Sequence, residues 1–283
     1  MTYKRIGIAV LCGLLLAAGV EAAEKRTVAR ENAYSSNYQV KQVPLDKKDM
    51  AEIKKTLPKG QKVPMVEQRV FYKGVMLPRD YQKIEIFGEN VATMGQAAAY
   101  IRANAPYVKL DCSIEELVEL YWKEAAVEGV RADLAICQAI LETGFFCYGG
   151  DVSRHQNNFC GLGTVGGGAR GAGFNTPQLG VRAHIQHLLA YSQKEKPKTK
   201  IIDPRYDLAH NIRLERGLVK TWYGLNGTWA MGKEYCEKIM NNYVNMLAIQ
   251  GVPATFDTRV KANGERRSLK DRLKRLNASR YKK

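Results

Sequence analysis

Glu142 is the residue of this chain whose surroundings most favour acid–base chemistry. It follows the apolar run 135–141, which predicts a buried helix, and Gln138, four residues earlier, shares its helix face. The partly negative helix C-terminus and the apolar surroundings both favour a protonated carboxyl, and the next Lys or Arg along the chain is Arg154. A carboxyl that keeps its proton near neutral pH can act as a general acid. The alternative is a glutamate that simply meets water where its helix ends.

A glycine-rich segment, residues 145–174, follows this helix. It contains Asn157, Asn158 and Phe159, and its glycines would let the backbone lie close to a bulky ligand. Amide side chains match the hydroxyl and N-acetyl groups of amino sugars, and an aromatic ring can stack on a pyranose face. The alternative is a flexible loop with asparagines at its turns. Asp151, after two glycines, is either a turn residue or a candidate base.

Several blocks resemble the glucosaminidase domain of peptidoglycan hydrolases, the mannosyl-glycoprotein endo-β-N-acetylglucosaminidase-like family. They occur in the family's order over roughly residues 91–250: QAILETGFF from Gln138, GGD from Gly149, QNNFCGLG from Gln156, GVRAHIQHL from Gly180, DPRY from Asp203, WA from Trp229 and YCEKI from Tyr235.

The resemblance implies a mainly α, lysozyme-like catalytic domain with a small mobile Gly-rich lobe. It implies hydrolysis of the β-1,4 bond after N-acetylglucosamine in peptidoglycan, with Glu142 as the general acid and no cofactor or metal. Asn157, Asn158 and Tyr235 match positions similar to the family's substrate cleft. We expect Glu142 and Tyr235 to be the catalytic residues. The expected substrate-binding residues are Gln138, Asn157, Asn158, Phe159 and Asp151.

The second catalytic group departs from a two-carboxylate pattern, because no acidic residue lies between Asp151 and Glu195. One hypothesis is that the substrate's own N-acetyl oxygen attacks the anomeric carbon, oriented by Tyr235 and Asn158. Asp151 as a base is the alternative.

Other functions fit parts of this pattern. A lytic transglycosylase also needs one acid, and a non-catalytic wall-binding protein would keep the cleft without the activity. A thiol peptidase using Cys147 or Cys160 lacks a readable triad, and His184 and His187 lack acidic partners at metal-ligand spacing. Action on the N-glycans of glycoproteins is chemically open but does not suit an exported bacterial protein.

The elements that must position these residues are helical. Apolar periodicity and capping signals predict helices near 94–103, 113–129, 132–141, 176–191 and 233–248. Ser113 and Glu116 are expected to form a capping box, and Thr176 and Pro177 an N-cap and first turn. Residues 91–251 are therefore predicted to form the catalytic domain.

The flanking segments indicate export. Residues 1–22 read as a cleaved signal peptide, which would leave no membrane span, and residues 23–90 as a linker or N-terminal segment with strand-like pieces. The last 25 residues carry eleven Lys or Arg and two acids, a charge of +9, so residues 252–283 form a basic tail suited to anionic envelope polymers rather than nucleic acid. The expected location is the periplasm, the cell wall or the extracellular space. Five cysteines follow the signal peptide; buried thiols are favoured, with a Cys137–Cys147 or Cys147–Cys160 bridge left open.

Overall fold

The computed structural model describes residues 38–44, 66–105, 107–164 and 170–256, together with the isolated positions 51 and 55. The chain divides into two compact units, Met1–Arg79 and Asp80–Lys283. The predicted signal peptide, most of the predicted basic tail and residues 165–169 of the glycine-rich segment lie outside the described residues. Within the described part, no helix has the length and apolar character needed to cross a membrane.

The first unit contains a small antiparallel sheet in the order β1-β2-β3, within the segment predicted as a linker. Its strands are β1 (Tyr38–Pro44), β2 (Val66–Tyr72) and β3 (Val75–Met76). Tyr38 pairs with Tyr72 and Pro44 with Val66. Lys73 and Gly74 connect β2 to β3 with φ of 48° and 78°, the left-handed pair of conformations that two-residue hairpin turns require.

The second unit is helical, which confirms the predicted mainly α fold class. Its helices are α3 (Met94–Asn104), α4 (Ile114–Glu128), α5 (Ala132–Thr143), α6 (Pro177–Ser192), α7 (Tyr206–Arg216) and α8 (Tyr235–Leu247), with short 3-10 turns η1 (Tyr81–Lys83), η2 (Arg154–Gln156) and η3 (Tyr223–Leu225). Of the six α-helices among the described residues of this unit, five lie where the sequence predicts them, and α7 has no predicted counterpart. Of the predicted caps, Thr176 accepts a hydrogen bond from the Leu179 amide, whereas Ser113 accepts one from the Glu116 amide without the reciprocal bond of a full capping box.

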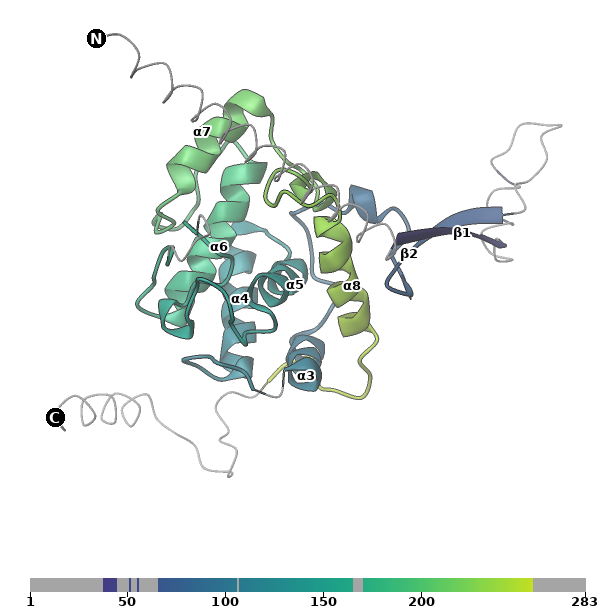
Figure 1. The fold of residues 1–283 in the computed structure, drawn as a ribbon, viewed down its shortest axis with the longest axis horizontal. Helices are drawn as coiled ribbons and strands as arrows, with labels where there is room; N and C mark the ends of the chain where they lie inside the picture. Colours follow the sequence, from purple (N-terminus) through teal and green to yellow (C-terminus); the bar gives the residue numbers. More distant parts are fainter. Residues whose placement is uncertain are drawn as a thin grey trace, which may run out of the picture. The chain divides into compact units, whose positions relative to one another are not determined.

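Helix α5 lies in the middle of this unit and packs against α3, α4 and α8 (Figure 1). Ten of its 12 residues are buried, as its apolar sequence requires. At its first turn, the buried Asp133 carboxylate accepts hydrogen bonds from the Arg131 guanidinium and from the backbone amides of Val91 and Ala92. The helix ends at Gly144, whose φ of 57° favours glycine. Both ends of the helix that carries Gln138 and Glu142 are thus fixed.

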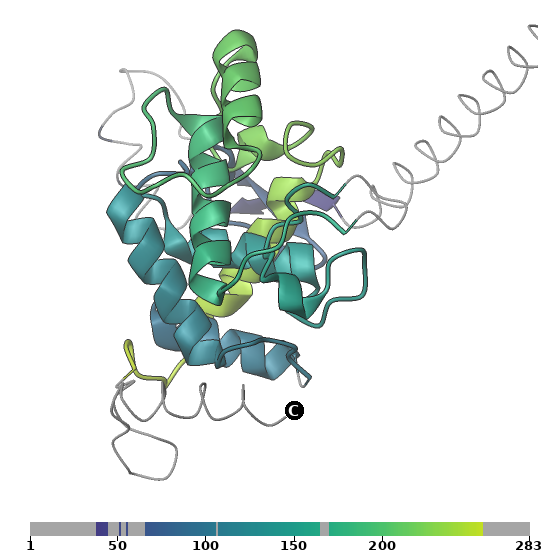
Figure 2. The same ribbon diagram turned by 90° about the vertical axis from the view of Figure 1, so that its left-hand side faces the viewer.

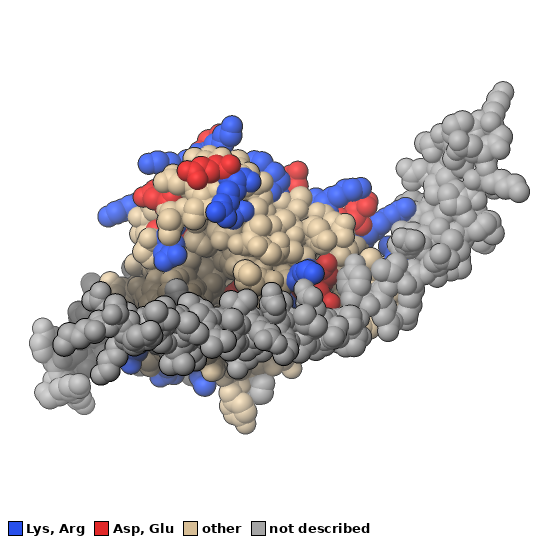
Figure 3. Space-filling view, turned by 45° about the horizontal axis from the view of Figure 1, so that its top comes forward, with Lys and Arg blue, Asp and Glu red and all other residues tan. Residues whose placement is uncertain are grey.

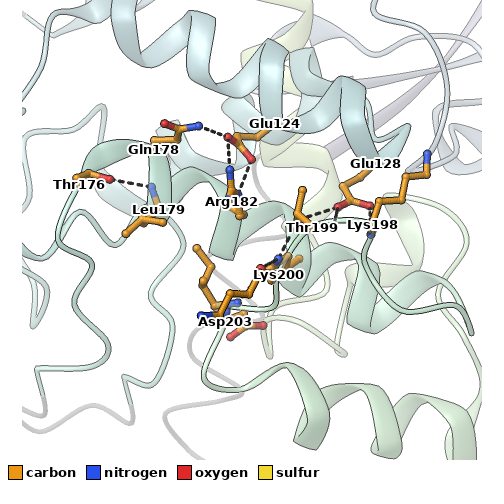
Figure 4. Close-up of polar contacts among 12 residues, drawn as sticks. Glu124, Glu128, Thr176, Gln178, Leu179, Arg182, Lys198, Thr199, Lys200 and Asp203 are labelled. Carbon is orange, nitrogen blue, oxygen red and sulfur yellow. Dashed lines mark hydrogen bonds and ion pairs between the residues drawn. The ribbon is translucent and has the colours of Figure 1, made fainter.

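Helix α6 packs against α4 on one side and α7 on another (Figures 1 and 2). Glu124 of α4 accepts hydrogen bonds from Arg182 and Gln178 of α6, at 2.8 and 2.6 Å (Figure 4). Burial opposes ionisation of Glu124, but these hydrogen bonds hold the pKa of its carboxyl below the usual value.

The segment 198–203 is fastened to α4 and α6. The Glu128 carboxylate accepts hydrogen bonds from the backbone amides of Lys198 and Thr199, at 3.0 and 3.1 Å (Figure 4). The Gln186 side-chain oxygen accepts hydrogen bonds from the amides of Ile202 and Asp203. This segment therefore brings Asp203 to α6 and sets the position at which α7 begins.

Candidate functional site

The side chain of Glu142 lies where two cavities meet, at the last turn of α5. The smaller cavity has a volume of about 360 Å³ and the larger one of about 510 Å³, and Glu142, Gly161 and Thr164 line both. We call the two cavities together the groove. Glu142 is exposed to solvent through the groove, although neighbouring protein atoms surround its carboxyl closely enough to oppose ionisation.

Two side chains from the last third of the chain donate hydrogen bonds to the Oε1 atom of Glu142. One donor is the Tyr235 hydroxyl and the other is the Trp229 indole Nε1, at 3.2 Å. Burial raises the pKa of the Glu142 carboxyl above its ordinary value, while the Tyr235 and Trp229 hydrogen bonds and the positive charge of Lys238 partly offset that rise. The net direction agrees with the expectation from the sequence.

Behind Tyr235, a line of buried polar side chains continues into the core. The Gln138 amide donates to the Tyr235 hydroxyl (2.8 Å), and its oxygen lies 3.0 Å from His184 Nε2. Because an amide oxygen only accepts, Nε2 of His184 carries the proton, and Nδ1 accepts from the Tyr121 hydroxyl at 2.9 Å. Burial lowers the pKa of His184 to about 3, so its ring is neutral. We call Tyr121, His184, Gln138 and Tyr235 the donor chain, since each member donates a hydrogen bond toward Glu142.

The two asparagines predicted to bind substrate hold the glycine-rich segment together. The side-chain amide of Asn158 donates to the backbone oxygens of Leu162 and Ala172, and its oxygen accepts from the Leu162 amide. Asn157 donates to the Phe174 backbone oxygen at 3.0 Å. Asn158 lines the larger cavity, but both of its amide hydrogens are engaged by the loop. Its contribution is therefore to shape the groove.

Residues 118–248 match the family model for glucosaminidase, described as mannosyl-glycoprotein endo-beta-N-acetylglucosaminidase. This part of the chain is a glucosaminidase domain. The glucosaminidase domain so defined contains α5 to α8 and includes Glu142, Trp229 and Tyr235. Its helical architecture agrees with the lysozyme-like fold that the resemblance implies.

A protein of Borreliella burgdorferi, described as an uncharacterized protein, is similar to this chain. The two are 36% identical over 134 residues, which cover 47% of this chain and 63% of the relative. This chain thus matches less than two thirds of the relative's length. No solved structure matches the chain.

Phe159 of the glucosaminidase domain lies in the core and not in the groove. Its side chain is 1% exposed and makes edge-to-face contacts with Tyr121 and Phe146. It cannot stack on a sugar in this arrangement, so the predicted substrate contact is corrected to a packing role. The rings that line the smaller cavity are those of Trp229, Tyr191 and His187, none of which is among the site residues predicted from the sequence. Trp229 was noted only as part of a family block.

The remaining predicted site residues have defined positions in the glucosaminidase domain. Asp151 is exposed and lines the larger cavity together with Glu142. Gln138 is fully buried and reaches Glu142 only through Tyr235, so it acts behind the groove.

The histidines of α6 have protein partners. His187 Nδ1 lies 2.7 Å from a carboxylate oxygen of Asp203, and His184 belongs to the donor chain. Among the described residues, no three His, Cys, Asp or Glu side chains are grouped so that they could hold a metal ion.

The cysteines of the described residues are free thiols. Cys137, Cys160 and Cys236 are buried, Cys112 and Cys147 are half-buried, and none is in a disulfide. The two bridges left open by the sequence are therefore not formed. Cys160 lines the smaller cavity, but burial raises the pKa of its thiol well above the usual value, which disfavours the thiolate that a peptidase nucleophile needs.

Proposed function

We propose that this chain is an exported peptidoglycan hydrolase that cleaves the β-1,4 bond after N-acetylglucosamine, with Glu142 as general acid. The observation that carries the proposal is the Glu142 carboxyl at the junction of two cavities, with a pKa raised by burial and with donors fixed on Oε1. A carboxyl so placed, whose pKa is raised, can carry a proton on its other oxygen and give it to a leaving glycosidic oxygen. The predicted signal peptide supports export.

We infer that the attacking group is the acetamido oxygen of the substrate. Glu142 gives its proton to the leaving oxygen while the acetamido oxygen bonds to the anomeric carbon and the glycosidic bond breaks. A water molecule then attacks the anomeric carbon and opens this cyclic intermediate, while Glu142, now a carboxylate, takes a proton from that water. The two displacements together retain the configuration. Tyr235 holds the Glu142 carboxyl throughout. Asn158, whose amide hydrogens are engaged by the loop, is left out of this step.

The alternative base is Asp151, which lines the larger cavity with Glu142. Acting on a water molecule from the opposite face of the sugar, it would invert the configuration. NMR of the sugar released at early times distinguishes the two mechanisms: retention supports attack by the acetamido group, and inversion supports Asp151.

A lytic transglycosylase is the second candidate, because the groove offers one well-placed acid. It would cut after the muramic acid residue and leave an anhydro end, whereas the proposed hydrolase leaves a reducing N-acetylglucosamine. Mass spectrometry of the released fragments separates the two.

The test of the proposed function is the Glu142→Gln variant on purified peptidoglycan. The amide keeps the shape of the side chain but has no proton to give, so we expect the release of reducing sugar ends to fall by about 10²- to 10⁴-fold. Glu89→Gln, at an exposed site away from the groove, is the matched control and should keep wild-type activity. Retained sacculus binding by both variants shows that the loss lies in chemistry. Equal turnover by Glu142→Gln would discard the assignment, and binding by an inactive wild type would identify a wall-binding protein.

A further inference from the structure

One side of α7 faces the smaller cavity. Arg205 just before the helix and Leu208, Ala209 and Ile212 within it line this cavity together with Glu142. Their spacing of three and four residues places them on one helix face. Leu208 is 51% exposed, a large apolar side chain left open to solvent next to the proposed catalytic acid.

The rest of the smaller cavity has a different character. The Trp229 ring contacts the rings of His187 and Tyr191, with centroid separations of 4.9 and 5.2 Å. Such an aromatic cluster suits the flat apolar face of a sugar. The branched aliphatic face of α7 suits methyl groups instead, so the cavity offers two kinds of apolar surface.

Arg205 adds a positive charge at the edge of the aliphatic face. Its side chain is exposed, and no acidic side chain of the described residues forms an ion pair with it. Its backbone amide donates to the Asp203 carboxylate at 2.8 Å, which fixes the position from which the guanidinium extends. Arg205 lines the same cavity as His187, Tyr191 and Trp229, which places it near the aromatic cluster. A guanidinium that forms no ion pair with the described residues can bind a carboxylate of a ligand.

We propose that this face of α7 binds the stem peptide that muramic acid carries next to the scissile bond. The inference rests on the proposed function and names the part of the substrate that the smaller cavity selects. The lactyl and first alanine methyl groups pack on Leu208 and Ile212, and the free carboxylate of the second, acidic residue pairs with Arg205. The peptide is covalently attached to the sugar chain, and the cavity that holds the α7 face also holds Glu142, so one substrate can occupy both.

The proposal is tested with two forms of one substrate. Purified peptidoglycan is compared with the same material after an amidase has removed its stem peptides, and kcat/KM is measured from new reducing ends. We expect the wild type to prefer the peptide-bearing form, and Arg205→Gln to reduce this preference roughly five-fold, the effect of a partly exposed charged hydrogen bond. Leu208→Ser should reduce it as well. Arg216→Gln, at an exposed position of α7 outside the cavity, is the matched control and should keep the wild-type preference.

The outcomes keep the two proposals apart. Equal kcat/KM of the wild type on the two forms would overturn stem-peptide recognition and leave the glucosaminidase proposal standing. Failure to cut either form would overturn the proposed function and, with it, this inference about its substrate. Calorimetry with the Glu142→Gln variant and N-acetylmuramyl-L-alanyl-D-glutamate gives a readout without turnover. Binding that Arg205→Gln weakens supports the inference, and binding that this change leaves unaltered contradicts it.

Discussion

The chemistry of Glu142 depends on two opposed influences on one carboxyl. The desolvation of the carboxyl at the last turn of α5 favours the protonated form, and the hydrogen bonds from Tyr235 and Trp229 favour the ionised form. Both donors reach the same oxygen, Oε1. Neither of these donors bonds the other oxygen, Oε2, and Glu142 lines both cavities of the groove. Because both donors bond Oε1, the Glu142 side chain is held in position while burial still raises the pKa of its carboxyl.

Tyr235→Phe tests this balance. The change removes the hydroxyl that stabilises the ionised carboxyl, so the pKa of Glu142 should rise further, and the basic limb of the kcat/KM profile should move to higher pH. We also expect kcat to fall roughly ten-fold, because a hydrogen bond to the charged form is lost after proton transfer. Tyr107→Phe, at an exposed position, is the control. A profile with an unmoved basic limb would show that Tyr235 does not act on this carboxyl.

His184 should make the protein sensitive to acid. Burial lowers the pKa of its ring from 6.5 to about 3, so the unfolded chain takes up a proton at a pH where the folded chain does not. The contribution of the neutral His184 ring to the free energy of unfolding is therefore fully present above pH 6.5 and is lost as the pH falls from 6.5 toward 3. We expect the Tm of the wild type to fall more steeply over this range than that of His184→Gln. His155→Gln, an exposed histidine, is the control and should keep the wild-type slope. Parallel slopes for wild type and His184→Gln would refute the neutral buried ring.

At the scale of elements, the sequence predicts α5 well because its signal is local. A run that is apolar on every side must be buried, and the position of Glu142 at its end follows directly. Helix α7 was missed because only Tyr206 and His210 of its residues are buried, so it carries little apolar periodicity. Of the two partners of Glu142, Tyr235 was expected from the family resemblance, whereas Trp229 was not, for another reason. Trp229 is 87 residues away along the chain, and no local spacing encodes such a contact.

The asparagines of the glycine-rich segment show that residue type alone does not identify a substrate-binding side chain. An amide is equally suited to a sugar and to a backbone carbonyl. Sequence cannot decide which of the two Asn158 meets, because the decision depends on how the segment closes on itself. The structure places Leu162 and Ala172 against it.

Gly180 tests the contact between α6 and this segment. Alanine favours helices by about 1 kcal/mol over glycine, so substitution at an open helical site would stabilise the protein. Here, an added Cβ would lie 1.8 Å from the backbone oxygen of Asn157. We therefore expect Gly180→Ala to lower the free energy of unfolding by on the order of 1–3 kcal/mol, measured by urea unfolding, and to reduce hydrolysis because the groove wall shifts. Gly232→Ala, where the added atom meets nothing within 4 Å, is the control. Unchanged stability of Gly180→Ala would mean that this close approach is not kept in solution.

At the scale of the whole molecule, charge is distributed unevenly along the chain. The face shown in Figure 3 carries Lys and Arg side chains interspersed with Asp and Glu, without a broad region of one sign. The formal net charge of the chain is +16, and the last 25 residues contribute +9 of it. Attraction to an anionic polymer is therefore expected to come largely from the tail, which lies outside the described residues, and the groove to contribute shape and hydrogen bonding.

Removal of the tail separates these contributions. A chain that ends at Phe256 keeps the hydrogen bond from the Gly95 amide to the Ala254 oxygen, and so keeps the described contact of the C-terminal segment with α3. We expect it to bind sacculi more weakly than the full chain at about 0.1 M salt, where charges act over ~10 Å, and equally at about 1 M, where the range falls to ~3 Å. Co-sedimentation measures the binding, and a full-length chain with the tail's Lys and Arg changed to Gln controls for length. Hydrolysis of small soluble muropeptides should be the same for all three, since these substrates reach only the groove. A difference in sacculus binding that persists at high salt would mean that the tail also binds through contacts that are not electrostatic. A difference in the hydrolysis of soluble muropeptides would mean that the tail contacts the groove itself.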